Sequence, residues 1–178
     1  MSQEPTRKSM PLVIGLILVV FVLGISLATG GGGASQPTKA FATNGPVNFS
    51  TTSTTPVSTG MGVTIKTVVS STVMIFLNSF MYDTGAGTVG LDNNVYFGTI
   101  SIPAQGSAPN AGDNVASAGN ADCGFVPDTL TLQITCALNM PETTLTVGVT
   151  YFFYTTLQTG NVLDTAHADF EVLTIQEV

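Results

Sequence analysis

Hydrophobic and polar residues alternate along most of the chain after about residue 62. In Leu130–Leu138 every second residue is apolar, with Thr131, Gln133, Thr135 and Ala137 between the apolar positions. A period of two is typical of a strand with one buried face and one solvent face. The same criterion predicts further strands at Val63–Val69, Val73–Met81, Gly87–Leu91, Val95–Ile102, Leu145–Leu157 and Ala168–Ile175.

These strands, about seven in number, predict the fold class. Clusters of Gly, Asn, Asp and Pro separate them, and no stretch among them shows the period of an amphipathic helix. We therefore expect an all-β domain, an antiparallel β-sandwich of immunoglobulin-like or jelly-roll-like type, with the choice of topology open. The stretch Ala104–Pro127 is predicted to be an irregular loop.

The segment Val73–Met81 differs from the other strands because it is apolar on both faces. At the edge of a sheet such a strand would invite aggregation. Two interpretations are therefore open: an interior strand of the sandwich, or a strand with one side buried by a neighbouring subunit.

In the predicted strand Leu145–Leu157, Phe152 and Tyr154 lie opposite the main apolar face. Both faces of that strand are therefore expected to be covered there.

An unbroken apolar run, Leu12–Ala28, precedes the alternating region. Arg7 and Lys8 lie before it and the glycines Gly30–Gly33 follow. Its length is at the lower edge of the roughly 17 to 25 residues that a spanning helix needs, so it fits either a membrane anchor or a signal peptide. Positive charge on the N-terminal side predicts that the N-terminus stays in the cytoplasm and the rest is exported.

The chain is thus predicted to have four parts: a cytoplasmic tail over residues 1–10, a transmembrane or signal helix over 11–29, a linker over 30–61 and an extracytoplasmic β-sandwich over 62–178. The linker is rich in Gly, Thr, Ser and Pro, which disfavour helices and central strands, and is expected to be a tether. It contains one glycosylation acceptor sequence, in which Asn48 would carry the glycan and Phe49 and Ser50 follow.

Charge and cysteine content agree with export. Charged residues make up 8% of the chain and the net charge is −7, so a partner that requires clustered Lys and Arg, such as nucleic acid, is excluded. The same acidity disfavours an anionic lipid surface as a partner of the exported domain. Cys123 and Cys136 are predicted to form one disulfide in an oxidising compartment. The alternative is two buried thiols, and no further ligands nearby suggest a metal site.

Three residue patterns could carry chemistry, and each also has a structural explanation. Asp83 begins an Asp-Thr-Gly triplet, as in aspartic proteases, but the triplet occurs once and also fits a turn. His167 lies between Asp164 and Asp169 without a nucleophile motif, so a solvent-facing turn is expected. Loop acids and amides could bind calcium, although no loop matches an EF-hand: Asp113, Asn114, Asn120, Asp122 and Asp128. We therefore expect no catalytic residue, no cofactor and no metal.

The run Arg7-Lys8-Ser9-Met10-Pro11, continued by the aliphatic Leu12–Val20, resembles the N-terminal signature of archaeal type IV pilin-like proteins. In that family a basic residue precedes a Ser-Pro-Val-Ile-Gly-like start and an aliphatic helix. The resemblance implies a hydrophobic helix that packs in a filament core beneath a β-sandwich headpiece.

A looser resemblance is to exported archaeal and bacterial fibre subunits in which a segment of one sandwich completes the sheet of the next. It implies that Phe41–Val57 is a donor strand and that the apolar helix is a removable signal peptide. Both resemblances imply a surface filament, through helices in one case and strands in the other.

The sequence therefore predicts a non-enzymatic structural subunit of a pilus-like or thread-like filament at the cell surface. Its partners would be further copies of itself and, through Leu12–Ala28, the membrane at least before assembly. Two alternatives remain: a membrane-anchored extracellular binding or adhesion module, and a viral membrane or spike protein. A hydrolase built on Asp83 is a third and weaker possibility.

Overall fold

The computed structural model describes residues 37–44, 48–85, 90–116, 134–142 and 144–178, and these belong to one compact unit, Pro37–Val178. The predicted tail and apolar helix, residues 1–29, lie outside the described residues. Within the ranges given above, no helix is long and apolar enough to cross a membrane.

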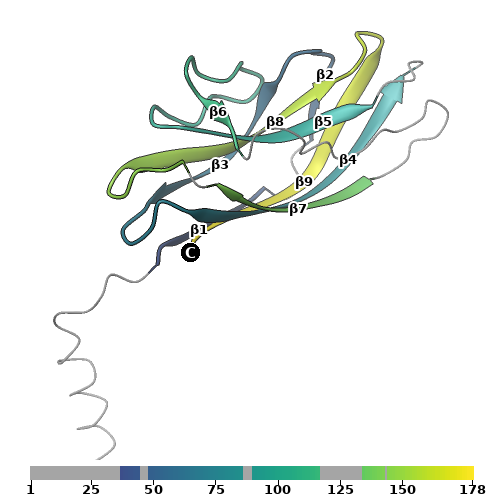
Figure 1. The fold of residues 1–178 in the computed structure, drawn as a ribbon. Coiled ribbons are helices and arrows are strands. Elements are labelled where there is room, and N and C mark those ends of the chain that lie inside the picture. The colour runs from purple at the N-terminus through teal and green to yellow at the C-terminus, as the bar shows by residue number, and fades with distance from the viewer. Residues whose placement is uncertain (1–36, 45–47, 86–89, 117–133, 143) are drawn as a thin grey trace, which may run out of the picture. The chain divides into compact units, whose positions relative to one another are not determined.

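The described part is built from two antiparallel β-sheets, as the alternating pattern predicts (Figure 1). Sheet A has the order β1-β9-β4-β7, and the short β2 also pairs with β9; sheet B has the order β3-β8-β5-β6. The strands of sheet A are β1 (Lys39–Asn44), β2 (Phe49–Thr51), β4 (Val73–Gly85), β7 (Ile134–Glu142) and β9 (Asp164–Glu177). Those of sheet B are β3 (Val57–Lys66), β5 (Leu91–Gly98), β6 (Asn114–Val115) and β8 (Thr150–Thr159).

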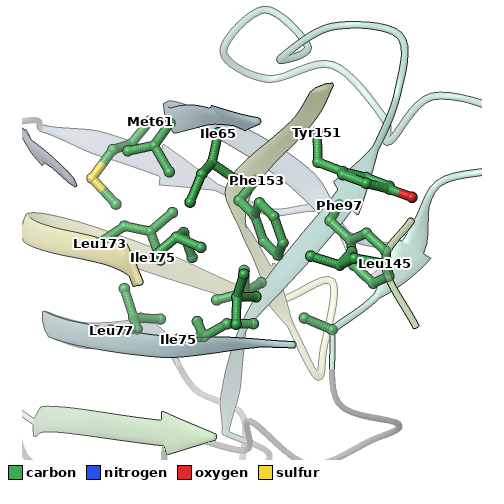
Figure 2. Packing of buried hydrophobic residues seen from close by; sticks show 14 residues of the cluster. Met61, Ile65, Ile75, Leu77, Phe97, Leu145, Tyr151, Phe153, Leu173 and Ile175 are labelled. Atoms are coloured by element: carbon green, nitrogen blue, oxygen red, sulfur yellow. The ribbon is translucent and has the colours of Figure 1, made fainter. Parts of the chain in front are cut away.

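The sheets pack face to face because each contributes alternate apolar side chains to a common core. The larger cluster contains residues of both sheets, among them Ile75 and Leu173 from sheet A and Phe97 and Phe153 from sheet B (Figure 2). The two phenylalanine rings stack with centroids 5.3 Å apart. A smaller second cluster contains Phe49, Met81, Leu91, Leu157, Ala166 and Ala168. An all-β fold of two packed antiparallel sheets is therefore confirmed.

Strand β4 lies inside sheet A, paired with β9 on one side and β7 on the other. This pairing agrees with the interior-strand interpretation of Val73–Met81. The strand is longer than predicted, since its pairing with β9 continues to Gly85 opposite Asp164. The interpretation of Asp83-Thr84-Gly85 as a turn is therefore wrong.

Two other strand boundaries differ from the sequence prediction. Strand β8 begins at Thr150, not Leu145, because residues 146–149 form a turn in which Gly148 has a φ of 86°. That turn exposes 46% of Val147, although Leu145 is buried as expected. Strand β5 ends at Gly98, not Ile102. Phe153 and Leu157 on one face of β8 and Tyr154 and Thr156 on the other are fully buried, so this part of the strand is covered on both faces, as predicted, although Phe152 is only half-buried.

The linker predicted over residues 30–61 is wrong for its second half. Strand β1 pairs with β9 from Lys39 opposite Gln176, and β2 continues along β9 to Thr51 opposite Ala166. Strand β3 begins at Val57. Residues that resemble a tether in composition thus complete both sheets, and the compact unit begins at Pro37 instead of residue 62.

Part of the outer face of sheet B is covered by the chain's own loop, residues 99–113, whereas Thr64 and Lys66 of β3 are exposed. Ser58 N donates to Ser107 O at 2.8 Å, and Ser58 Oγ donates to the buried Pro103 carbonyl at 3.1 Å. Further along, the Tyr154 hydroxyl donates to Asp113 Oδ2 at 2.7 Å. Gly98 allows this approach, because a Cβ there would overlap the Asp113 carboxylate. The predicted loop over Ala104–Pro127 contains one short strand, β6, in its described part.

Candidate functional site

A layer of polar side chains crosses the core between the two apolar clusters. Each of five strands contributes one inward-facing polar residue, flanked two positions away by an apolar core residue. On β4, for example, Ser79 lies between Leu77 of the larger cluster and Met81 of the smaller one. The five residues are Thr59 on β3, Ser79 on β4, Asn93 on β5, Thr155 on β8 and Glu171 on β9, all at most 2% exposed.

Glu171 is the centre of this polar layer. Its Oε2 accepts hydrogen bonds from Thr59 Oγ1 at 2.9 Å and Thr155 Oγ1 at 2.8 Å. Its Oε1 accepts from Asn93 Nδ2 at 2.6 Å and, more weakly, from Ser79 Oγ at 3.4 Å. These four uncharged donors match the four acceptor positions of a carboxylate.

The polar layer connects the two sheets, since Thr59, Asn93 and Thr155 come from sheet B and Ser79 and Glu171 from sheet A. A buried carboxylate costs free energy unless donors replace its water, and here every donor is held by a different strand. With its acceptor positions occupied, Glu171 acts as a structural anchor between the sheets. Within the described ranges, Asn93 Oδ1 is buried and has no hydrogen-bond partner.

Sequence reasoning missed this layer, although a signal was present. In the predicted strand Ala168–Ile175, Glu171 has the same parity as Leu173 and Ile175, which places it on the core face. A charged residue at a position that the alternation assigns to the core indicates a buried polar site.

A second buried carboxylate, Glu177, joins three parts of the chain. Its Oε1 accepts the backbone N–H groups of Val68, Val69 and Ser70 at 2.9, 2.6 and 2.6 Å, and its Oε2 accepts that of Thr38 at 2.9 Å. Burial by itself raises the pKa of this carboxyl, but the four backbone donors outweigh burial and lower the pKa to about 2.

The single histidine lies in a strand, so the expectation of a solvent-facing turn is wrong. His167 is in β9 opposite Tyr82 of β4, and the two rings stack with centroids 4.4 Å apart and an interplanar angle of 2°. Thr84 Oγ1 is 2.9 Å from His167 Nε2. Asp83 lies between these partners, half-buried and opposite Ala166. The contacts of His167 are therefore those of a cross-strand pair.

The loop acids considered for calcium are only partly described. Asp113 Oδ2 accepts from the Tyr154 hydroxyl and, at 2.9 Å, from Asn110 Nδ2. Burial, followed by the bond to Asp113, raises the pKa of Tyr154. Asn114 is exposed in β6. Asn120, Asp122 and Asp128 lie outside the described residues, and the residues that the structure does describe hold no group of three His, Cys, Asp or Glu suited to a metal.

Two modification sites predicted from the sequence lie in or beside residues that the structure does not describe. Asn48 is exposed immediately before β2, and Phe49, the next residue, is buried. A glycan on Asn48 would therefore project from the edge of the sandwich. Cys123 lies outside the described residues and Cys136 lies in β7, so the predicted disulfide between them stays a prediction.

The outer face of sheet A carries a stripe of apolar side chains. On β4 the outward positions are Met74, Phe76, Asn78, Phe80 and Tyr82, and none is charged. Phe80 lies opposite Phe170 of β9. Exposure is 38% for Phe76 and 42% for Phe170, so part of this stripe is exposed.

Comparison with known proteins assigns no family. No protein-family model matches the chain, and no curated protein does. Among solved structures, the VP2 subviral particle of infectious bursal disease virus is similar with a TM-score of 0.37 and 10% identity over 81% of this chain. A structure of the Gx strain of that virus gives 0.34 and 13% over the same share. The chain spans about a third of each of those proteins, 33% in both cases.

Proposed function

We propose that this chain is a non-enzymatic structural subunit of an extracellular surface filament, which assembles through its N-terminal segment and its β-sandwich. The observation that carries the proposal is the apolar stripe on sheet A. Phe76, Phe80 and Phe170 lie together on one sheet face, and exposed apolar patches of this kind mark interaction surfaces. The lack of charge on the β4 part of the stripe favours an equally uncharged partner, such as a neighbouring subunit.

The assembly has two possible links, and each has support. The apolar run Leu12–Ala28 suits packing of helices in a filament core. The arm formed by β1 and β2 suits strand exchange, because it pairs along β9 from Gln176 to Ala166 and its backbone could be replaced by the same arm of another copy. In both assemblies the stripe on sheet A is available for lateral contact.

Electron microscopy of shed surface material, combined with mass spectrometry of the mature N-terminus, tests the proposal. Fibres whose subunit begins near Met10 or Pro11 support helix-core assembly. Fibres that begin after Ala28 support strand exchange. An intact Met1 or Ser2 without fibres contradicts the filament and leaves an anchored ectodomain.

The role of the stripe is tested by Phe76→Thr and Phe170→Thr. Each removes a ring that a neighbour would bury, which is worth on the order of 1–2 kcal/mol, so the critical concentration for polymerisation should rise about tenfold per substitution. Val162→Thr is the control, because Val162 is 69% exposed in the turn between β8 and β9. Equal effects of all three substitutions would contradict the assignment of the stripe.

A further inference from the structure

The two lysines of the described residues lie at the same end of the sandwich. Lys39 begins β1 opposite Gln176, and Lys66 ends β3 opposite Thr150. Both side chains are exposed. We call this end the proximal end and define it as residues 37–39, 66–72, 144–150 and 176–177; the distal end comprises residues 83–85, 90–92 and 158–164.

Hydrogen bonds join the segments of the proximal end into one surface. Glu177 binds the backbone of Thr38 and of residues 68–70, as described above. Gly148 N donates to Thr67 O at 2.8 Å, and Thr67 Oγ1 donates to the carbonyl of Thr146 at 3.3 Å. The turns after β3 and before β8 therefore lie side by side.

Three valines are exposed on these turns. Val68, Val69 and Val147 have exposed fractions of 39%, 43% and 46%. Because Thr67 bonds to the turn that contains Val147, the three side chains belong to one region. Exposed aliphatic groups flanked by lysines form an amphipathic surface.

The two acids in or next to the proximal end are buried, so its exposed charged side chains are the lysines. Glu177 and Glu142, next to this end, are 1% and 5% exposed, and both are held by hydrogen bonds inside the fold. The other acids of the described part lie outside the proximal end: Asp83, Asp92, Asp113, Asp164, Asp169 and Glu171. The exposed charged side chains at the proximal end are therefore the two lysines, whereas Asp83, Asp92 and Asp164 lie at the distal end.

The position of the first described residue brings this end within reach of a membrane. Pro37 is part of the proximal end, and the predicted apolar run ends at Ala28. Nine peptide steps at ~3.4 Å each span at most about 30 Å. If the run spans a bilayer, the proximal end is tethered within that distance of the membrane surface.

We infer that the proximal end docks on a lipid bilayer surface that carries anionic headgroups. The valines would enter the interface and Lys39 and Lys66 would bind lipid phosphates. This inference rests on the membrane-inserted stage of the proposed subunit. The inference revises the earlier expectation, drawn from the net charge of the chain, that an anionic lipid surface is disfavoured. The electrostatic interaction with a lipid surface is screened beyond about 10 Å, so it depends mainly on the charges that face the lipid.

Tryptophan fluorescence tests the docking, since the chain has no tryptophan of its own. The full chain is reconstituted in vesicles of phosphatidylcholine and phosphatidylserine as Val147→Trp, with Val162→Trp at the distal end as the matched control. We expect brominated lipid to quench Val147→Trp at least threefold more than Val162→Trp. Val69→Trp provides a second probe if Val147→Trp does not fold.

Three results would overturn the inference. One is equal quenching of the proximal and distal probes. Another is a proximal probe that lipid does not quench. The last is a blue-shifted but unquenched proximal probe, which would mean that another copy of the chain covers this end.

The lysines are tested by Lys39→Gln combined with Lys66→Gln in the Val147→Trp background. The ratio of docked to undocked protein should fall roughly fivefold per lysine in anionic vesicles and stay unchanged in neutral ones. An equal effect in both would overturn the role of the lysines. Since filaments are scored separately by electron microscopy, failure of docking is distinguishable from failure of the proposed function.

Discussion

At the scale of single residues, the most demanding group in this fold is the Glu171 carboxylate. A charge in an apolar core is tolerated only where donors replace its hydration, and the strength of each bond rises in the low dielectric. Thr59, Thr155 and Asn93 supply those donors from the opposite sheet. The polar layer therefore fixes which residues of the two sheets face each other, which an apolar core specifies less strictly.

Thr155→Val removes one of these donors while keeping the side-chain shape. We expect the free energy of unfolding to fall by about 2 kcal/mol, because the bond to a buried carboxylate is lost. Thr155 Oγ1 also lies 2.5 Å from Thr59 Oγ1. In a background that carries both Glu171→Met and Thr59→Val, the same change should cost less than about 0.5 kcal/mol, since both hydrogen-bond partners of Thr155 are then apolar. Urea denaturation of the four proteins measures the coupling, with the exposed Thr64→Val as control. A cost that is the same in wild type and in this background would contradict the anchor role.

Glu177 makes stability depend on pH. Its pKa is about 2 in the folded protein against the ordinary 4.5, so its contribution is complete above about pH 4.5 and is lost as the pH falls through 2. Glu177→Gln should therefore destabilise the protein at pH 7, and the difference from wild type should shrink between pH 4.5 and 2. Denaturation curves at pH 7, 4 and 2.5 measure it, and a constant difference across that range would contradict this assignment.

At the scale of elements, the pattern of apolar residues predicted the positions of several strands better than their ends. The region of Val95 and Phe97 became β5, and Val73–Met81 became the interior strand β4. Boundaries were less predictable because turns depend on single residues. The turn at Gly148 delays the start of β8 to Thr150. By contrast, the sequence around the Asp-Thr-Gly triplet does not show that β4 continues through it, because this part of the strand is stabilised by its pairing with β9.

Strands β1 and β2 could not be predicted because they are short and lie among Gly, Pro, Ser and Thr residues that resemble a tether. Backbone hydrogen bonds to β9 hold them, and an existing sheet edge supplies those bonds to almost any sequence without proline. Of the polar layer, the sequence could indicate the burial of single residues but not their hydrogen bonds to one another. The phase of Glu171 marks it as a core residue, but its four donors come from strands far apart in the sequence.

At the scale of the whole molecule, the two outer sheet faces differ. The loop covers part of sheet B through Ser58, Pro103 and Asp113, whereas two phenylalanines of the apolar stripe on sheet A are exposed. The two ends differ as well, since both described lysines lie at the proximal end. A molecule whose two sheet faces and two ends differ in exposed side chains suits assembly in a fixed orientation, which agrees with the proposed filament.

The extent of the folded unit gives the last prediction, which compares a protein lacking residues 1–36 with one lacking residues 1–61. The first keeps β1, β2 and all of β3. The second removes them up to Met61, exposes the edge of β9 and deletes Thr59 from the polar layer. We expect cooperative thermal unfolding by circular dichroism for the first and no cooperative transition for the second, because the loss of a core residue and a whole sheet edge exceeds a typical stability of 5–15 kcal/mol. If both proteins unfold at the same temperature, residues 37–61 are a tether after all, and the boundary at residue 62 drawn from composition is right.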